Sequence, residues 1–264
     1  MSLRLGYPGY ASLGTEANVV AQWLFDEAAG NIVDEVAGLA LAQTGAFGGG
    51  AVYNVASGSP WQNLSPGITM SDGLTYAAFF SVAGMGAGLN FGASDFVVEA
   101  WFRCDAGAAA PYLLILQHSV TLDRFSIYLN FNTLIINAEL YDGETATLID
   151  QPFVISDFRG DGKLHKVRVA GARAGNATVY LDETSLGTFD ISALVGESLN
   201  WDTLVVGNDA VSGTGMVGGM YELRITVGNA TNNSFRPTRI GTTADGNITR
   251  TETVISGNPP DPLS

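Results

Sequence analysis

The chain has little of the chemistry on which most catalytic and metal sites depend. Among its 264 residues there is one cysteine, Cys104, and there are two histidines, His118 and His165. A single cysteine excludes an intrachain disulfide and any multi-cysteine zinc site, and within an apolar strand it is typical of a core side chain. Two histidines leave little material for His-dependent catalysis. Because His165 stands between Lys163 and Lys166, we expect it on a solvated strand face.

Charged residues are also scarce, at 14%, and basic residues are the scarcest: 12 Lys and Arg stand against 26 Asp and Glu, a formal net charge of −14. Such a chain repels phosphate backbones and anionic lipid, so we expect no nucleic-acid partner. No apolar run is long enough for a membrane span or resembles a signal peptide, so we expect no membrane insertion. The sequence thus predicts a protein made in a cytosol that stays soluble.

Apolar stripes at helical spacing are missing, and strand patterns take their place. In FVVEAWFRCD, residues 96–105, apolar side chains occupy both alternating sets of positions. This pattern predicts a central strand that is buried on both faces, with Trp101 in or near the core. Two further runs have the same character, LHKVRVAG at 164–171 and MYELRITVG at 220–228.

The rest of the chain alternates short strand patterns with polar turns. About a dozen such strands without helical crossovers predict an antiparallel sandwich in one domain over residues 19–228. Residues 1–18 and 229–264 have no clear periodicity and carry glycine, tyrosine and proline. We interpret them as N-terminal and C-terminal arms.

The order of motifs resembles the laminin-G-like, concanavalin A-like lectin/glucanase superfamily. The resemblance rests on VVAQWLFDEAAGNIVDEVAG, FVVEAWFR, GKLHKVRVAG with ATVYLDETSLG, LVVGND and GGMYELRITVGNAT, which together span residues 19–228. It implies an all-β fold, a two-sheet antiparallel jelly-roll sandwich, here with extended N- and C-terminal arms. The positions that match structural strand positions of the family are Trp23, Phe25, Trp101, Phe102 and His165.

The resemblance also allows a test of hydrolase activity. Glucanase members of the superfamily use two glutamates on one strand, whereas Glu99, Glu139 and Glu222 each stand alone here. We therefore expect that the chain is not an enzyme. A glycoside hydrolase is a remote alternative. Glu99, on the central strand, is expected to be paired or to lie at the rim.

Acidic residues beside glycine turns indicate calcium as a cofactor. Asp26 and Asp34 follow the first strand, and Glu222 would join them if the first and last strands pair. The family pattern has an acidic pair before its last long strand, and here Tyr221 replaces the first member. A solvated turn is the alternative interpretation of the two aspartates.

Aromatic residues near predicted loops indicate a carbohydrate site. A glycan needs an aromatic platform beside amide or carboxylate groups, and a core or interface role is the alternative. The candidates are Trp61, Tyr53, Tyr112 and Trp201.

The two arms favour assembly into a larger particle. They carry isolated apolar anchors that could lie across a neighbouring subunit: Tyr7, Tyr10, Phe235, Ile240 and Ile255. A lectin-like domain without a signal peptide can reach the outside of a cell when a virus lyses it. We therefore predict a homo-oligomeric virion protein, such as a bacteriophage decoration, fibre or tail-associated protein that meets other virion subunits and a host-surface glycan. A soluble carbohydrate-binding module is the main alternative.

Overall fold

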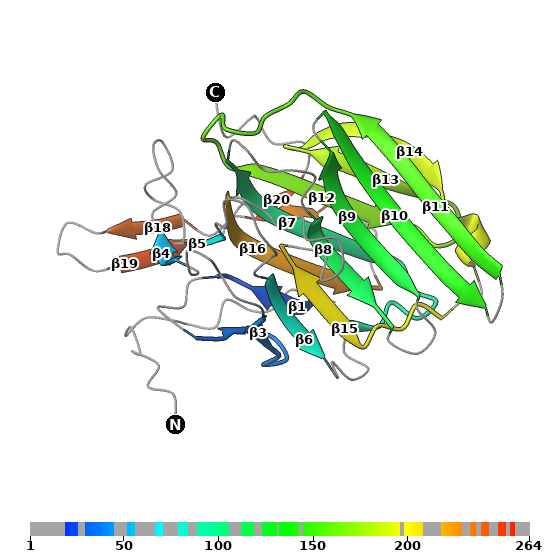
Figure 1. Ribbon diagram of the computed structural model, residues 1–264, viewed down its shortest axis with the longest axis horizontal. Helices are drawn as coiled ribbons and strands as arrows, with labels where there is room; N and C mark the ends of the chain where they lie inside the picture. The colour runs from blue at the N-terminus through cyan, green and yellow to red at the C-terminus, as the bar shows by residue number, and fades with distance from the viewer. Residues whose placement is uncertain are drawn as a thin grey trace.

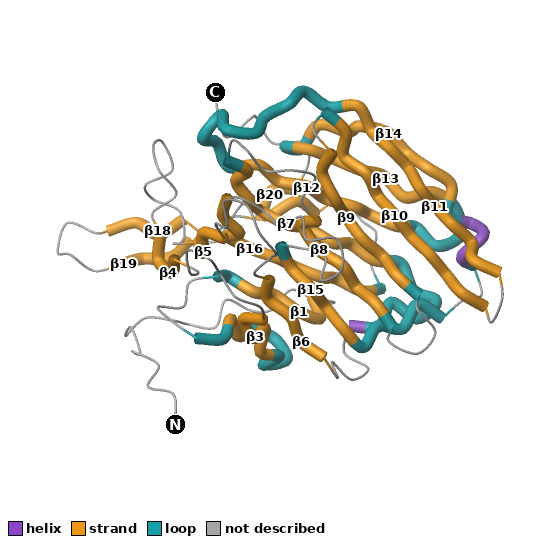
Figure 2. The backbone as a smooth tube through the Cα atoms, in the orientation of Figure 1, coloured by secondary structure: helices purple, strands orange, loops and turns teal. Residues whose placement is uncertain are grey.

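The computed structural model describes residues 19–25, 30–44, 52–55, 67–70, 79–83, 89–105, 112–118, 123–130, 132–142, 145–195, 198–207, 218–228, 233–235, 239–242, 248–251 and 254–256. Their backbone forms two large antiparallel sheets packed face to face (Figure 1, Figure 2). The predicted all-β sandwich is therefore confirmed. In the described part of the chain, no helix has the length and apolar character needed to cross a membrane.

The first sheet is built around β7 (Phe96–Cys104), and we call it the β7 sheet. β7 pairs antiparallel with β12 (His165–Gly171) on one side and with β16 (Gly218–Val227) on the other, so the predicted central strand is confirmed. The outer strands are β13 (Asn176–Leu181) and β14 (Thr184–Asp190) beyond β12, and β1 (Val19–Trp23), β5 (Gly67–Met70) and β4 (Val52–Val55) beyond β16.

The second sheet has eight strands, and we call it the β9 sheet. Its order is β11 (Thr145–Val154), β10 (Thr133–Asp142), β9 (Arg124–Asn130), β8 (Tyr112–Gln117), β15 (Thr203–Val206), β6 (Phe79–Ala83), β3 (Ala40–Thr44) and β2 (Ile32–Val33). A short 3-10 helix, η2 (Ser192–Leu194), follows β14.

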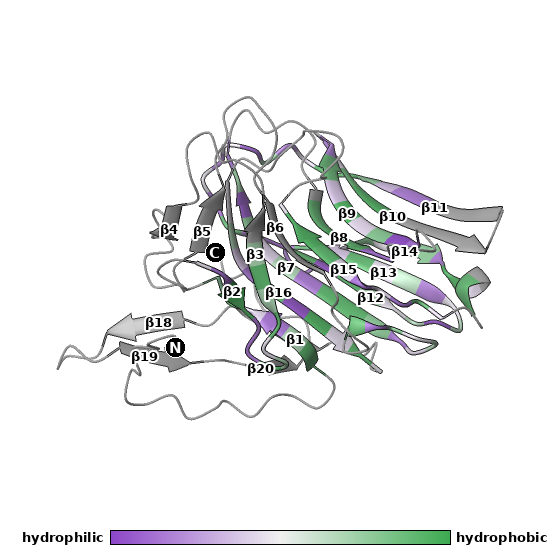
Figure 3. Ribbon diagram, turned by 60° about the horizontal axis from the view of Figure 1, so that its bottom comes forward, coloured by the Kyte–Doolittle hydropathy of each residue, from purple (hydrophilic) through white to green (hydrophobic). Residues whose placement is uncertain are grey.

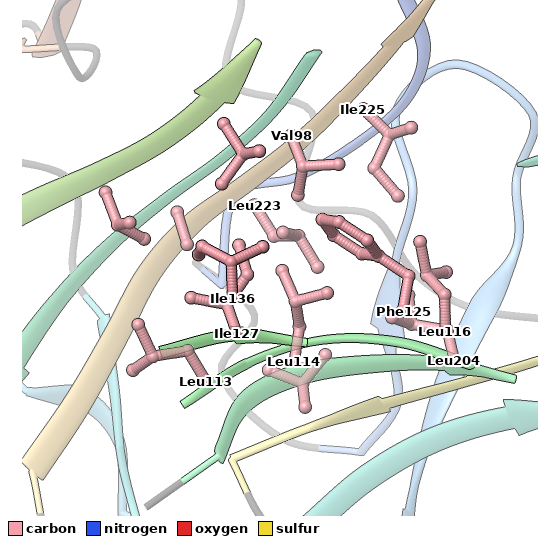
Figure 4. Close-up of a cluster of buried hydrophobic side chains, with 14 of the residues drawn as sticks. Val98, Leu113, Leu114, Leu116, Phe125, Ile127, Ile136, Leu204, Leu223 and Ile225 are labelled. Atoms are coloured by element: carbon pink, nitrogen blue, oxygen red, sulfur yellow. The ribbon is translucent and has the colours of Figure 1, made fainter. Parts of the chain in front are cut away.

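The core lies between the two sheets and is made of their inward side chains. Val98 and Ile225 of the β7 sheet face Phe125, Ile127 and Leu204 of the β9 sheet, and all are nearly or fully buried (Figure 4). Each such side chain contributes about 1.5–3 kcal/mol when fully buried. Among the residues predicted at structural strand positions, the core contains Trp23, Phe25 and Phe102.

Trp101 lies outside this core. It alternates with Phe102 along β7 and so points to the other face, where it is buried in a small cluster with Leu164 and Tyr221. The prediction that Trp101 lies in or near the core is therefore correct for its burial, but its partners are on the outer side of the sheet.

The segment predicted as an extended C-terminal arm contains four short strands. β17 (Asn233–Phe235) pairs with β20 (Val254–Ser256), and β18 (Arg239–Thr242) pairs with β19 (Ile248–Thr251). Threonine, isoleucine and valine favour pairing of this kind. Three predicted assembly anchors, Phe235, Ile240 and Ile255, lie in these strands, while Tyr7 and Tyr10 lie outside the described residues. Their role in assembly stays a prediction.

Candidate functional site

The outward side of the β7 sheet carries charged and aromatic side chains from its three middle strands. The backbone register places Arg168, Glu99 and Arg224 in one row across β12, β7 and β16, and Lys166, Trp101 and Glu222 in the next row. Figure 3 shows hydrophilic residues interrupting the hydrophobic ones along these strands. We call these six residues the charged face.

Lys166 is the most highly paired residue of the charged face. Its Nζ lies 2.7 Å from Glu99 Oε1 and 3.0 Å from Glu183 Oε1, and Arg168 approaches the same Glu183 carboxylate at 3.9 Å. Glu183 comes from the turn between β13 and β14. The expectation that Glu99 is paired is therefore confirmed, with a partner from the neighbouring strand.

Glu222 is paired within its own strand and across to β1. Arg224 donates to Glu222 Oε1 at 2.8 Å, and the Gln22 side-chain amide donates to the same oxygen at 2.8 Å. Aromatic rings complete the set of partners: the Arg168 guanidinium lies 3.8 Å from the centre of the Tyr180 ring, and Lys166 Nζ lies 5.4 Å from Trp101.

A β-bulge in β16 brings a further aromatic residue to this side. The register shifts between Met220 and Glu222, and Tyr221 packs against Trp101 and Leu164. The ring of Tyr221 lies over Gly219, where a Cβ atom would come within 3.0 Å of it. Burial raises the pKa of the Tyr221 hydroxyl. The nearby Arg103 cation lowers it, but by less than burial raises it.

The charged face is closed to solvent. Its five charged members, Glu99, Lys166, Arg168, Glu222 and Arg224, are only 2–4% exposed. In a sandwich of two layers, the outward side of a sheet normally faces water. The charged face is thus a buried ionic layer, and it is not accessible to a soluble ligand in this conformation.

The outward side of the β9 sheet combines half-buried polar side chains with a buried row formed by Ser126, Ile115 and Val205. Gln117, Arg124, Tyr128 and Thr203 point away from the core on β8, β9 and β15, and all are half-buried. The register pairs Gln117 with both Arg124 and Thr203. We call these four residues, together with Ser126, the polar face. It combines a phenol ring with amide, guanidinium and hydroxyl groups.

Ser126 marks the middle of the polar face. It alternates with the core residues Phe125 and Ile127, is 0% exposed, and its Oγ has no hydrogen-bond partner among the described residues. A buried hydroxyl without a partner is unfavourable by roughly 1–3 kcal/mol, so such groups usually meet a water or a ligand. Sequence analysis missed Ser126 and Tyr128, although the alternation of β9 was visible.

Two of the predicted calcium ligands are placed by hydrogen bonds. Asp34 is buried, and its carboxylate accepts from the backbone N–H groups of Gln22, Val36 and Ala37 at 2.5, 3.1 and 2.5 Å. β1 and β16 do pair, as the prediction required, and Gln22 links Asp34 to Glu222. The described residues contain no group of three or more potential metal ligands, and Asp26 lies outside them. Calcium stays a prediction.

The predicted carbohydrate-binding aromatics do not come together among the described side chains. Trp201 is 2% exposed and packs edge-on against Phe91 at 5.6 Å, which agrees with the core alternative. The backbone register places Tyr112 opposite Tyr128 of the polar face. Only the backbone of Tyr53 is described, and Trp61 lies outside the described residues.

His165 is not solvated, contrary to the prediction. It is 5% exposed, its ring lies 4.1 Å from that of Phe158, and its Nδ1 and Nε2 lie 2.7 and 3.2 Å from Asp182 Oδ2 and Asp161 Oδ2. Burial lowers the pKa of the ring, but the two carboxylates outweigh it, so that the pKa is raised. Flanking lysines misled the prediction, because His165 points toward Phe102 of the core and Lys166, on the opposite face of the strand, is itself buried.

Comparison with known proteins identifies the fold through structure alone. No family model matches the sequence, and no curated protein matches it. Among solved structures, the binding domain of botulinum neurotoxin serotype D has a TM-score of 0.56 at 10% identity, and the match covers 79% of this chain and 47% of that one. The binding domain of botulinum neurotoxin DC in complex with rat synaptotagmin II has a TM-score of 0.57 at 13% identity, over 82% and 49%.

A third structure is similar over nearly its whole length. Domain 4 of AbnA, an extracellular GH43 arabinanase from Geobacillus stearothermophilus, in complex with arabinotriose, has a TM-score of 0.55 at 13% identity, over 81% of this chain and 94% of that one. This chain spans about half the length of the toxin binding domains. These similarities show the fold: the chain is a concanavalin A-like jelly roll, the fold of lectin-like and carbohydrate-binding domains.

Proposed function

We propose that this chain is a non-catalytic carbohydrate-binding domain whose glycan lies on the polar face. The observation that carries the proposal is that the half-buried Tyr128 and Arg124 lie on the same outward side of β9, with the half-buried Gln117 opposite Arg124. A sugar offers apolar C–H groups to an aromatic ring and hydroxyls to polar groups, and the polar face provides both kinds of partner.

The comparisons support this proposal through one shared fold. A domain of similar fold, matched over 94% of its length, is in complex with arabinotriose. A toxin binding domain in complex with rat synaptotagmin II is matched over 49% of its length. The half-buried polar groups of Gln117, Arg124 and Thr203 can meet the hydroxyls of a glycan, which supports the glycan as the ligand.

The test is binding to a panel of oligosaccharides that includes arabinotriose, measured by calorimetry. We expect Tyr128→Ala to weaken binding roughly tenfold, since an aromatic contact contributes about 0.5–1.5 kcal/mol. Tyr180→Ala removes a half-buried tyrosine from the other sheet and is the matched control. Absence of binding across the panel, or equal loss with both variants, would contradict the proposal. Release of reducing sugar would overturn its non-catalytic part.

A role as an adhesion subunit of a virus particle is a second, finer proposal. Its support is the sequence of the terminal segments, with isolated apolar anchors at both ends of the chain. Mass spectrometry of purified particles tests it directly, because a virion subunit must copurify with them. If Tyr128→Ala then reduces attachment of particles to cells without removing the protein from them, the glycan site serves adhesion.

A further inference from the structure

The segment between β11 and β12 passes the end of β7 beside His165, and we call its residues 157–163 the strap. The backbone N–H of Gly160 donates to the Cys104 carbonyl, at the end of β7, at 2.8 Å. The Phe158 ring is buried, whereas the four residues from 160 to 163 are exposed. The strap is therefore a surface segment that is fixed at a few defined contacts.

The His165 ring stands between two carboxylates that come from separate elements. Its Nδ1 lies 2.7 Å from Asp182 in the β13–β14 turn, and its Nε2 lies 3.2 Å from Asp161 in the strap. An imidazolium has an N–H on both nitrogens and can donate to both carboxylates, whereas a neutral imidazole has one N–H and one lone pair. A neutral ring must therefore leave one of the two carboxylates without its donor.

The other contacts of the two carboxylates decide which one loses its donor. Asp182 accepts the Lys166 backbone N–H at 2.8 Å and donates its own backbone N–H to the Lys166 carbonyl at 2.8 Å, so β12 holds it in place. Asp161 accepts the backbone N–H of Lys163 at 2.8 Å, and this donor belongs to the strap and moves with it. The proton of the neutral ring therefore stays on Nδ1, and the lone pair of Nε2 faces Asp161.

The other charged groups of the turn and the strap are directed elsewhere. Glu183, the second residue of the turn, lies 3.0 Å from Lys166 Nζ on the opposite face of β12. In the strap, Asp157 lies 2.7 Å from Arg159, and the Lys163 side chain is exposed. Two aspartates of these elements are thus left to face the histidine ring.

β7 adds no competing charge to the ring. It contributes Phe102, whose ring centre lies 6.3 Å from that of His165. β7 ends at Cys104, whose thiol stays neutral because burial raises its pKa to about 12. Beyond it, Asp105 is paired with Arg103 at 2.8 Å. The protonation of His165 is therefore set by its burial and by the two aspartates.

We propose that His165 is a pH-controlled latch that closes the strap when it is charged and releases it when it is neutral. Release frees Asp161, and residues 159–163 then move away from the end of β7 while the β13–β14 turn stays in place. Because the pKa of His165 is raised above 6.5, the strap is closed in acid and opens as pH rises through that pKa. This inference is independent of the glycan proposed on the β9 sheet.

Two backbone N–H groups report separately on the two sides of the latch. Gly160 donates to the Cys104 carbonyl on the strap side, and Asp182 donates to the Lys166 carbonyl on the turn side. Hydrogen exchange of each amide, corrected for the intrinsic effect of pH on exchange, measures the opening of that side. The chain has only two histidines, so an NMR titration of the ring nitrogens follows His165 directly.

The experiment measures both amides in the full chain from below to above the titration of His165. We expect the protection of Gly160 to fall on the order of tenfold or more as the ring loses its proton, while Asp182 stays protected. His118→Gln is the matched control and should respond like the unmodified chain. Constant protection of Gly160 through the titration, or an equal loss at both amides, would overturn the latch.

A second variant tests the chemistry and retains the size of the side chain. In Asp161→Asn, the amide can accept from the imidazolium and can donate to the Nε2 lone pair of the neutral ring. The strap should then stay closed, with Gly160 protected below and above the titration, although the His165 ring still titrates. If Gly160 in Asp161→Asn still loses protection as the ring becomes neutral, the strap opens for another reason and the latch is disproved.

Discussion

At the scale of single residues, His165 shows how burial and neighbouring charge oppose each other. Burial alone disfavours the imidazolium, but Asp182 and Asp161 hold its two N–H groups from the β13–β14 turn and from the loop before β12. Phe158 and Phe102 cover the ring. The residue therefore joins a loop to a turn as a buried, charge-assisted bridge.

The pH dependence of stability should follow from this bridge. Because the pKa of His165 in the folded chain is raised above 6.5, its contribution is fully present below that pH and is lost as pH rises through the folded pKa. We expect the urea midpoint to fall on this account as pH rises from about 6.5 through the raised pKa of the folded state. His165→Gln should remove that part of the slope and cost about 1–3 kcal/mol at low pH, while His118→Gln should retain the slope. An unchanged slope in His165→Gln would exclude the bridge.

Asp34 offers a residue-scale test between hydrogen bonding and calcium. Its carboxylate accepts from three backbone N–H groups, and hydrogen bonds to charged groups contribute about 1.5–3 kcal/mol each. We expect Asp34→Ala to lower the free energy of unfolding by about 2–4 kcal/mol in chelator and in calcium alike. Glu35→Ala, at an exposed position of the same turn, is the control. A loss seen only in calcium would show that Asp34 is a metal ligand.

At the scale of elements, the strands could be predicted because alternation is local. Residues 96–105 showed their central position through apolar side chains on both faces, and β7 is indeed flanked on both sides. The partner of Glu99 could not be predicted, because the register that places Lys166 beside it is set by packing of distant strands. The polar face was missed for the same reason, since Gln117 and Arg124 come together only through the pairing of β8 with β9.

The burial of Lys166 and His165 was the main error of sequence analysis, and its causes differ. Lysine normally lies at the surface, so a strand with two flanking lysines indicates a solvated face. Here Lys166 is buried in ion pairs with Glu99 and Glu183, and two aspartates hold the histidine on the other side of the strand. Neither cause is encoded in the local alternation pattern, because both involve residues from separate elements.

The pair of Glu99 and Lys166 gives a prediction for the middle of the β7 sheet. Removal of one partner leaves the other charge buried, so Glu99→Gln and Lys166→Met should each cost about 3 kcal/mol. The combination of Glu99→Gln with Lys166→Met should cost less than the two single losses together, because both members of the pair are then neutral and Glu183 keeps Arg168 at 3.9 Å. Urea denaturation of all variants measures this. Strict additivity would show that the pair does not act as a unit.

At the scale of the whole molecule, the two sheets differ in what they offer to partners. The β9 sheet has half-exposed polar and aromatic side chains, whereas the β7 sheet has its ionic rows under cover. The half-buried side chains of the β9 sheet are therefore within reach of a ligand, whereas the ionic rows of the β7 sheet are not. The two sheets share one hydrophobic core, so a substitution that destabilises one sheet also destabilises the other.

The net charge of −14 should make the protein select neutral over anionic glycans, and this selectivity belongs to the whole molecule rather than to one residue. A negative molecule repels anionic ligands over a distance of about 10 Å at 0.1 M salt, and neutral ligands are unaffected. We therefore expect neutral oligosaccharides to bind with the same affinity at low and high salt. Sialylated glycans of similar size should bind more weakly at low salt and gain affinity as salt rises. Arg124 lies on the polar face, where its positive charge would attract an anionic glycan against the repulsion from the net charge. Arg124→Gln therefore separates the two effects. If anionic glycans bind more tightly at low salt and lose that advantage in Arg124→Gln, the local cation determines selectivity instead of the net charge.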